Sequence, residues 1–253
     1  MRVIVTRPAA QAADWVLQLC QRGIDAVALP LIGIAPVEDA APVAAAWLEL
    51  AQQRLVVFVS PNAAEQFFAR RPASSDWPDA VLTGSPGPGT TRALIELGVA
   101  PKRIIEPAAD APQFDSESLW AQLAARDWQG ARVLIVRGDG GRDWLADTLR
   151  SHGARVTHVA AYRRIAPAFG ADETTLLQAA IERPASHLWF FSSSEAVDNL
   201  AAAAPAPDRD GWSRAQAIAT HPRIAARARR LGFGRVIETR PSLDAVMACI
   251  QSI

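Results

Sequence analysis

An internal repeat limits the folds open to this chain more than any other feature of its sequence. Each copy contains a short apolar run, a predicted helix with a tryptophan, a glycine stop and a second apolar run. The copies agree again further along, where an apolar run ends in hydroxyl residues. The matching pairs are residues 2–7 with 132–137, Asp14 and Trp15 with Asp143 and Trp144, Gly23 with Gly153, 34–36 with 165–167, and 58–63 with 190–195. The sequence therefore predicts two similar α/β units.

The apolar runs alternate with Ala- and Leu-rich stretches of helical length, such as residues 37–50 and 168–183. Continuous apolar strands that alternate with helices are typical of parallel sheets covered by helices on both faces. We therefore expect two similar doubly wound parallel-sheet domains of the flavodoxin-like kind. The segments 72–78 and 201–211 are rich in Pro, Ala, Ser and Asp, and we expect them to be surface connections.

Charge and cysteine content argue against several classes of function. The chain carries 26 basic and 26 acidic residues, so a general attraction to nucleic acid or to an anionic membrane is not expected. Cys20 and Cys249 are too few for a disulfide framework, and the four histidines show no metal-ligand spacing. No apolar run reaches about 18 residues, and the chain begins with a predicted strand instead of a charged leader. We expect no metal and a cytoplasmic location.

Polar residues that follow the predicted strands are the candidates for a binding site. Ligands of doubly wound sheets bind beyond the carboxyl ends of the strands, where helix N-termini offer free N–H groups to an anion. A glycine-rich loop at residues 84–91 has a threonine where a nucleotide-binding loop needs lysine, so nucleotide hydrolysis is not favoured. The candidates are Ser60, Asn62, Thr90, Ser192, Ser194, Thr220 and His221. Thr90 has an equal alternative interpretation as a simple helix cap.

Two arginines occupy equivalent positions in the repeat. Arg7 and Arg137 each stand at the carboxyl end of the first predicted strand of a copy. They could supply positive charge for an anionic ligand, or each could serve a structural ion pair, and the sequence weighs both interpretations equally.

Tyr162 is the only tyrosine of the chain. It follows a predicted strand at residues 156–161 and precedes Arg163 and Arg164. A phenol beside cations can donate a strong hydrogen bond or act as an acid. Taken alone, however, a tyrosine at a strand end is more often structural than catalytic.

The order of these motifs resembles that of the uroporphyrinogen-III synthase family. The resemblance covers essentially the whole chain and rests on the joint order of short motifs rather than on any single one. Those motifs are Val-Ile-Val-Thr-Arg-Pro (3–8), Ala-Leu-Pro-Leu-Ile-Gly-Ile (28–34), Phe-Val-Ser-Pro-Asn-Ala (58–63), Gly-Pro-Gly-Thr-Thr-Arg-Ala-Leu (87–94), Val-Leu-Ile-Val-Arg-Gly (133–138), Tyr-Arg-Arg (162–164) and Thr-His-Pro-Arg-Ile-Ala (220–225).

The resemblance implies two α/β domains joined by a two-stranded connector, with a cleft between them. Residues 1–36 and 167–253 would form the first domain and residues 37–166 the second, in agreement with domain crossings expected at Pro36 and Pro167. The implied protein is a monomer without cofactor. Its implied substrate is the linear tetrapyrrole hydroxymethylbilane, handed over by hydroxymethylbilane synthase.

The implied reaction closes that tetrapyrrole to uroporphyrinogen III with inversion of ring D, through loss of the hydroxyl group and a spiro intermediate. By position, Tyr162 would assist departure of the hydroxyl and Thr90 would bind a substrate carboxylate. Thr220 or His221 would correspond to the related loop of the other domain. The alternative from another class is a non-enzymatic two-domain module that binds a small polyanion or has a regulatory role, because the fold alone does not decide function.

Overall fold

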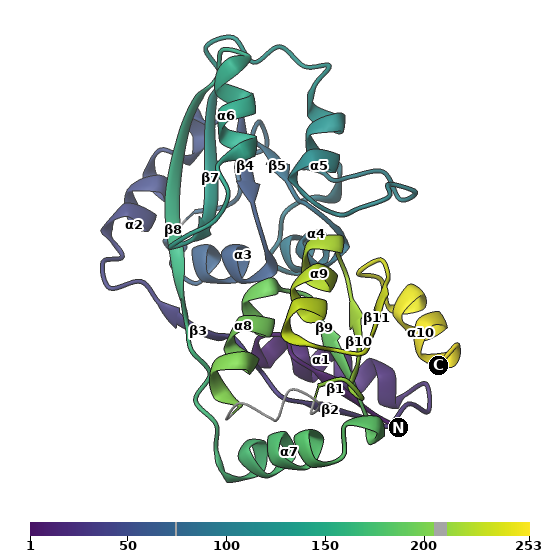
Figure 1. Ribbon diagram of the computed structural model, residues 1–253. Helices are drawn as coiled ribbons and strands as arrows, with labels where there is room; N and C mark the ends of the chain where they lie inside the picture. The colour runs from purple at the N-terminus through teal and green to yellow at the C-terminus, as the bar shows by residue number, and fades with distance from the viewer. Residues whose placement is uncertain (74, 205–211) are drawn as a thin grey trace. The chain divides into compact units, whose positions relative to one another are not determined.

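The computed structural model describes residues 1–73, 75–204 and 212–253, and the chain divides into two compact units (Figure 1). Unit 1 consists of Met1–Gly33 and Ile165–Ile253, and unit 2 consists of Ile34–Arg164. The crossings expected at Pro36 and Pro167 thus lie two or three residues after the observed divisions. In the two predicted surface connections, residues 74 and 205–211 lie outside the described residues.

Unit 1 has a five-stranded sheet in the order β11-β10-β9-β1-β2, in which all neighbouring strands are parallel. Helices pack on both faces, as expected for strands that are apolar on both sides. The strands are β1 (Arg2–Val5), β2 (Ala26–Ala28), β9 (His187–Phe191), β10 (Gln216–Ala219) and β11 (Arg235–Glu238). The helices are α1 (Ala9–Cys20), α7 (Ala171–Glu182), α8 (Ser194–Ala203), α9 (Pro222–Leu231) and α10 (Leu243–Gln251).

Unit 2 is built on a six-stranded sheet in the order β3-β8-β7-β4-β5-β6. The pairs from β8 through β6 are parallel. The strands are β3 (Gly33–Pro36), β4 (Leu55–Phe58), β5 (Leu82–Gly84), β6 (Ile104–Ile105), β7 (Arg132–Gly138) and β8 (Arg155–Ile165). The helices are α2 (Ala41–Leu48), α3 (Pro61–Phe68), α4 (Pro88–Glu96), α5 (Ser116–Leu123) and α6 (Trp144–Ser151).

The two sheets share one strand order, and each draws its strands from both copies of the sequence repeat. When strands are numbered within each repeat copy, β1 and β7 are strand 1, and β2 and β8 are strand 2. In this numbering β2-β1-β9-β10-β11 and β8-β7-β4-β5-β6 both follow the flavodoxin-like order 2-1-3-4-5. The sheet of unit 1 joins β1 and β2 of the first copy to β9–β11 of the second. The predicted parallel α/β architecture is therefore confirmed, but a repeat copy is not itself a compact unit.

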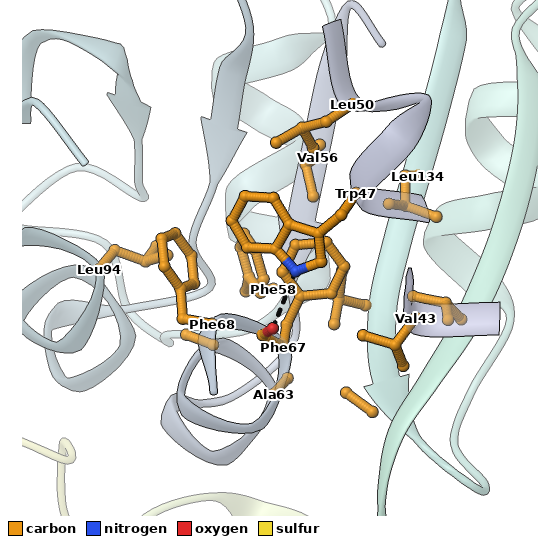
Figure 2. Packing of buried hydrophobic residues seen from close by; sticks show 14 of the residues in the cluster. Val43, Trp47, Leu50, Val56, Phe58, Ala63, Phe67, Phe68, Leu94 and Leu134 are labelled. Atoms are coloured by element: carbon orange, nitrogen blue, oxygen red, sulfur yellow. Dashed lines mark hydrogen bonds between the residues drawn. The ribbon is translucent and has the colours of Figure 1, made fainter. Parts of the chain in front are cut away.

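Aromatic side chains fill the face of the unit 2 sheet that is covered by α2, α3 and α4. Trp47 stacks on Phe67 with ring centroids 4.7 Å apart, and its indole N–H donates to the Phe67 carbonyl oxygen at 3.0 Å (Figure 2). Phe58 of β4 packs against Phe67, and Phe68 of α3 packs against Trp47. Buried aromatic area of this kind contributes strongly to stability.

Unit 1 has its own aromatic cluster, on the β9 side chains that point away from α1. Trp189 and Phe191, two residues apart on β9, share a face and contact Phe233, while Trp212 stacks on Phe233 at 5.0 Å between ring centroids. The opposite face buries Trp15 of α1 against Phe190.

The predicted equivalence of Trp15 and Trp144 is wrong. Trp15 lies in the middle of α1 and is 9% exposed, whereas Trp144 is the first residue of α6 and is 38% exposed. In the second copy the residue before the tryptophan, Asp143, is at the N-cap position, so the helix begins later relative to the strand. Among the described residues, no helix is long and apolar enough to span a membrane.

The chain passes between the units on two neighbouring strands. The divisions at residues 33/34 and 164/165 fall within β3 and β8, which are adjacent in the sheet. Gly33 lies so close to Ile165 that a Cβ atom at position 33 would be 2.6 Å from its Cγ1. Arg163 of β8 donates to the Pro36 carbonyl oxygen at 3.3 Å and pairs with Glu38 at 2.9 Å. These contacts hold the neighbouring strands together.

Candidate functional site

Tyr162 lies inside a strand, and not after one as its sequence context suggested. The strand β8 continues through Tyr162 to Ile165, and the side chain of Tyr162 is 1% exposed. Because Tyr162 pairs with Gly138, the last residue of β7, the phenol still lies near the carboxyl edge of the sheet. That edge is where doubly wound sheets bind their ligands.

A β-bulge determines the direction in which Tyr162 points. Arg137 pairs with Ala160 and Gly138 pairs with Tyr162, so Ala161 is an extra residue on β8. Side chains of a regular strand alternate between faces, yet Ala161 and Tyr162 both join the core cluster that α3 covers. The bulge therefore turns the phenol toward α3, which agrees with the tendency of bulges to redirect side chains at functional sites.

The phenol oxygen of Tyr162 meets the N-terminus of α3. Ser60, the N-cap residue of this helix, accepts a hydrogen bond from the Ala63 N–H at 3.2 Å, and its Oγ lies 3.2 Å from the Tyr162 hydroxyl. Arg164 donates to the same phenol oxygen at 3.5 Å, with its guanidinium 5.9 Å from the ring centroid. Two segments that are far apart in sequence, the N-terminus of α3 and the end of β8, thus converge on one hydroxyl group.

The other two candidates of unit 2 lie in the first turns of α3 and α4. Asn62 is the second residue of α3 and is half-buried. Thr90 is the third residue of α4 and is 4% exposed. The interpretation of Thr90 as a helix cap is wrong, because the N-cap residue is Gly87. The hydroxyl oxygen of the next residue, Thr91, lies 2.9 Å from Ser85 Oγ and 2.6 Å from Glu106 Oε2, and its single hydrogen is donated within this group.

In unit 1 the serine that caps the helix is Ser193, which lies between the candidates Ser192 and Ser194. Ser193 accepts from the Glu195 N–H at 3.2 Å and is the N-cap of α8. Since Ser60 caps α3 in the same way, the match between residues 58–63 and 190–195 is displaced by one residue. Ser193, and not Ser192, is the structural equivalent of Ser60, and Phe191 is the equivalent of Phe58.

Thr220 and His221 connect β10 to α9. Thr220 is 6% exposed, and its N–H donates to the Phe191 carbonyl oxygen at 3.1 Å. His221 is the N-cap residue of α9, where its Nδ1 accepts from the Arg223 N–H at 3.1 Å. The imidazole therefore has a capping role in addition to any role toward a ligand.

The equivalent arginines Arg7 and Arg137 differ in their partners. The Arg7 guanidinium lies over two rings of unit 1, 4.9 Å from the centroid of Trp15 and 5.6 Å from that of Phe190. Arg137 forms an ion pair with Asp143 at 2.5 Å. For Arg137 the structure thus shows the ion pair that the sequence left as one of two interpretations.

Charges around Arg137 shift two pKa values. The hydrogen bond from Arg137 lowers the pKa of the Asp143 carboxyl group below its usual range. Burial lowers the pKa of His158, and Arg137 and Arg150 lower it further, although Asp143 is 3.7 Å from its Nε2 and acts in the opposite direction. His158 is therefore predominantly neutral at neutral pH.

The structure brings together some of the predicted residues and adds others. Ser60 and Tyr162 meet in unit 2, while Arg137 turns to the other face of the sheet with Asp143 and His158. Arg164 was expected beside the phenol from its place two residues after Tyr162, and the structure confirms this contact. Gly138 was not predicted as a neighbour of the phenol, because nothing in its spacing from Tyr162 indicated that the two residues meet.

The comparisons with known proteins agree with one another. A family model described as uroporphyrinogen-III synthase HemD matches residues 13–248. The uroporphyrinogen-III synthase of Escherichia coli K12 is 28% identical over 257 residues, which covers 99% of this chain and 100% of that protein. Two solved structures share the fold at low identity. They are a mutant uroporphyrinogen III synthase of Thermus thermophilus (18% identity, 100% of this chain and 98% of that chain, TM-score 0.60) and the enzyme of Helicobacter pylori (16%, 100% and 99%, TM-score 0.58).

Proposed function

The chain belongs to the uroporphyrinogen-III synthase family, and from this premise we propose that it closes hydroxymethylbilane to uroporphyrinogen III with inversion of ring D. The observation that carries the proposal is the match of the family model to residues 13–248, nearly the whole chain. The comparisons do not favour the alternative of a non-enzymatic module, because the matching relatives carry the name of the enzyme.

We propose that Tyr162 is the proton donor of the reaction. In this role the phenol gives a proton to the departing hydroxyl group, the carbon–oxygen bond breaks, and water leaves. Ring D then attacks the resulting cation through its substituted carbon, and the spiro intermediate rearranges to the product. The proton released as the pyrrole regains aromaticity restores the phenol of Tyr162, so the net change is loss of one water molecule. Because Tyr162 is 1% exposed, this role requires substrate binding to uncover the phenol oxygen.

The remaining candidate residues are proposed to hold the carboxylates of the substrate. Ser60, Asn62 and Thr90 lie at helix N-termini of unit 2, and Ser192, Ser194, Thr220 and His221 lie at helix N-termini of unit 1. Free N–H groups at these ends and the local positive dipole favour anionic oxygens. Arg7 and Arg137 are proposed to add positive charge. The main task of such a site is to hold a flexible chain in one pose while it stabilises a cation.

An isomer assay tests this function. Purified protein is added to freshly generated hydroxymethylbilane, the product is oxidised, and the type I and type III isomers are separated by chromatography. We expect type III to dominate, whereas a sample without protein gives type I by spontaneous closure. Type I alone in the presence of protein would contradict the proposed enzyme and favour the binding module.

We further propose that the protein is a cytoplasmic monomer that receives its substrate from hydroxymethylbilane synthase and needs no cofactor. Light scattering would measure the mass in solution against the 27.1 kDa of one chain. An added excess of catalytically inactive hydroxymethylbilane synthase should lower the yield of type III product in a coupled assay if the substrate passes directly between the two proteins. An unchanged yield would contradict direct transfer.

A further inference from the structure

We propose that Ser60 is a positioning residue that fixes the phenol of Tyr162 and leaves the phenol proton available for the substrate. This proposal rests on the role proposed above for Tyr162 and replaces direct substrate contact as the main task of Ser60. It is carried by the contacts of three groups with the phenol: Ser60, Arg164 and Gly138.

The contacts of Ser60 hold its oxygen beside the phenol. A serine hydroxyl has one hydrogen to donate and two lone pairs that accept. One lone pair of Ser60 accepts from the Ala63 N–H at 3.2 Å, which holds Oγ at the N-terminus of α3. The hydrogen and the second lone pair of Ser60 both lie within reach of the Tyr162 hydroxyl at 3.2 Å, where either group could donate, and the proposal assigns the donation to Ser60.

Arg164 is a second hydrogen-bond donor to the phenol oxygen. A guanidinium group only donates, so the phenol oxygen accepts from Arg164 at 3.5 Å. In the proposed arrangement Ser60 and Arg164 both donate to the phenol oxygen, so the hydrogen of Tyr162 points to neither of them. That hydrogen is left for a third partner, and the departing hydroxyl group of the substrate is such an acceptor.

Gly138 restrains the ring from the side of β7. A Cβ atom at position 138 would lie 3.0 Å from the Tyr162 Cζ and 3.1 Å from its Cε2. Any larger residue at position 138 would therefore push the ring by a few tenths of an ångström away from the backbone of β7. The ring lies against β7 while Ser60 and Arg164 hold its oxygen, so the phenol has one preferred orientation.

A kinetic comparison tests the role of Ser60. Ser60→Ala should lower kcat about three- to tenfold with KM changed less than about twofold, because the lost hydrogen bond orients the donor and does not bind the substrate. Ser60→Thr keeps both the hydroxyl and the cap and should restore kcat. Ser242→Ala is the matched control for cap loss, since Ser242 caps α10 by accepting from the Ala245 N–H at 3.3 Å. It should leave kcat unchanged.

A double-mutant cycle separates action through Tyr162 from action on the substrate. If Ser60 acts only through the phenol, Ser60→Ala should cause no further loss of kcat in a Tyr162→Phe background. A loss that persists in full in that background would overturn the proposal. A loss in Ser242→Ala equal to that in Ser60→Ala would also overturn it, because cap removal alone would then explain the effect.

The single tyrosine of the chain allows a measurement that does not depend on turnover. With tyrosine labelled by ¹³C at Cζ, the protein gives one Cζ resonance, whose shift reports the hydrogen bonds of the phenol oxygen. Ser60→Ala should shift this resonance, while Ser60→Thr and Ser242→Ala should not. Lack of type III product from the wild-type protein would overturn the function proposed above. An unmoved resonance in an active enzyme would overturn only the role of Ser60.

Discussion

Unit 1 and unit 2 share a strand order but differ at the second strand of the repeat, which is β2 in one and β8 in the other. The strand β2 spans only Ala26–Ala28, and Pro30 follows shortly after it. The strand β8 spans Arg155–Ile165 and contains the bulge at Tyr162. Unit 1 ties the segment after β2 to a helix through Asn199, which donates to the Leu31 carbonyl oxygen at 2.7 Å. Unit 2 ties β8 to a helix through Tyr162 and Ser60. The same strand order therefore carries the hydrogen bond of Asn199 to a backbone carbonyl in unit 1 and the proposed proton donor Tyr162 in unit 2.

The paired arginines show the same divergence. Arg7 lies over aromatic rings that α1 and β9 provide, whereas Arg137 lies beside Asp143, the residue before α6. The helix begins later after the strand in the second copy, which places the Asp143 carboxylate beside Arg137. Equivalent positions in a repeat therefore predict the backbone better than they predict the side-chain partners.

The largest expected effect tests whether the two cores are built alike. Phe58 and Phe191 occupy equivalent strand ends and are both fully buried. Replacing either with alanine should lower the free energy of unfolding by about 3–5 kcal/mol, because each substitution removes buried contacts and leaves a cavity. Urea unfolding of Phe58→Ala and Phe191→Ala measures both values. A cost below about 1 kcal/mol for only one of them would break the comparison.

The second-largest expected effect tests Tyr162 of β8, the strand at which the two units differ. Tyr162→Phe removes the hydroxyl but keeps the ring against Gly138, so we expect kcat for type III product to fall about 100-fold with little change in stability. The isomer assay and thermal unfolding, carried out on the same preparation, measure the two quantities. Wild-type turnover in this variant would remove Tyr162 from the mechanism and with it the chemical asymmetry of the units.

A smaller effect distinguishes the two arginines. Arg137→Leu should have a small cost in stability that disappears in high salt, because its partner Asp143 is 54% exposed. Arg7→Leu should cost about 0.5–2 kcal/mol, because it removes the contacts of the guanidinium with the rings of Trp15 and Phe190. Urea unfolding at low and high salt measures each cost. A cost of Arg7→Leu that is smaller than that of Arg137→Leu would contradict this difference between the arginines.

The smallest effect concerns His158, whose pKa is lowered in the folded protein chiefly by burial. The unfolded chain therefore takes up a proton at a higher pH than the folded protein. Its contribution to stability is present above the ordinary histidine pKa of about 6.5 and is lost as the pH falls below it. In His158→Gln the loss of stability between about pH 7 and pH 5.5 should be smaller than in the wild type. An unchanged pH profile of the melting temperature would show that His158 titrates alike in both states.

The sequence by itself determined the parallel α/β architecture and the family. Apolar runs alternating with helical stretches, and a repeat of whole motifs, are local properties that survive divergence, because each depends on burial and on turn chemistry rather than on a particular partner. The place of Ser60 between a predicted strand and a helix N-terminus was also predictable for this reason, since it depends only on neighbouring residues.

The tertiary structure alone decided how the repeat copies divide between the two sheets and where the side chains of the candidate site point. Strand exchange between copies depends on which edges pair across more than 100 residues, as Val5 and Phe190 do, and no local pattern encodes that pairing. The bulge beside Ala161 reverses the face on which Tyr162 lies, because side chains alternate with a period of two and one extra residue shifts that alternation. The contact of Ser60 with Tyr162 depends on that single extra residue, so it follows from sheet register and not from sequence spacing.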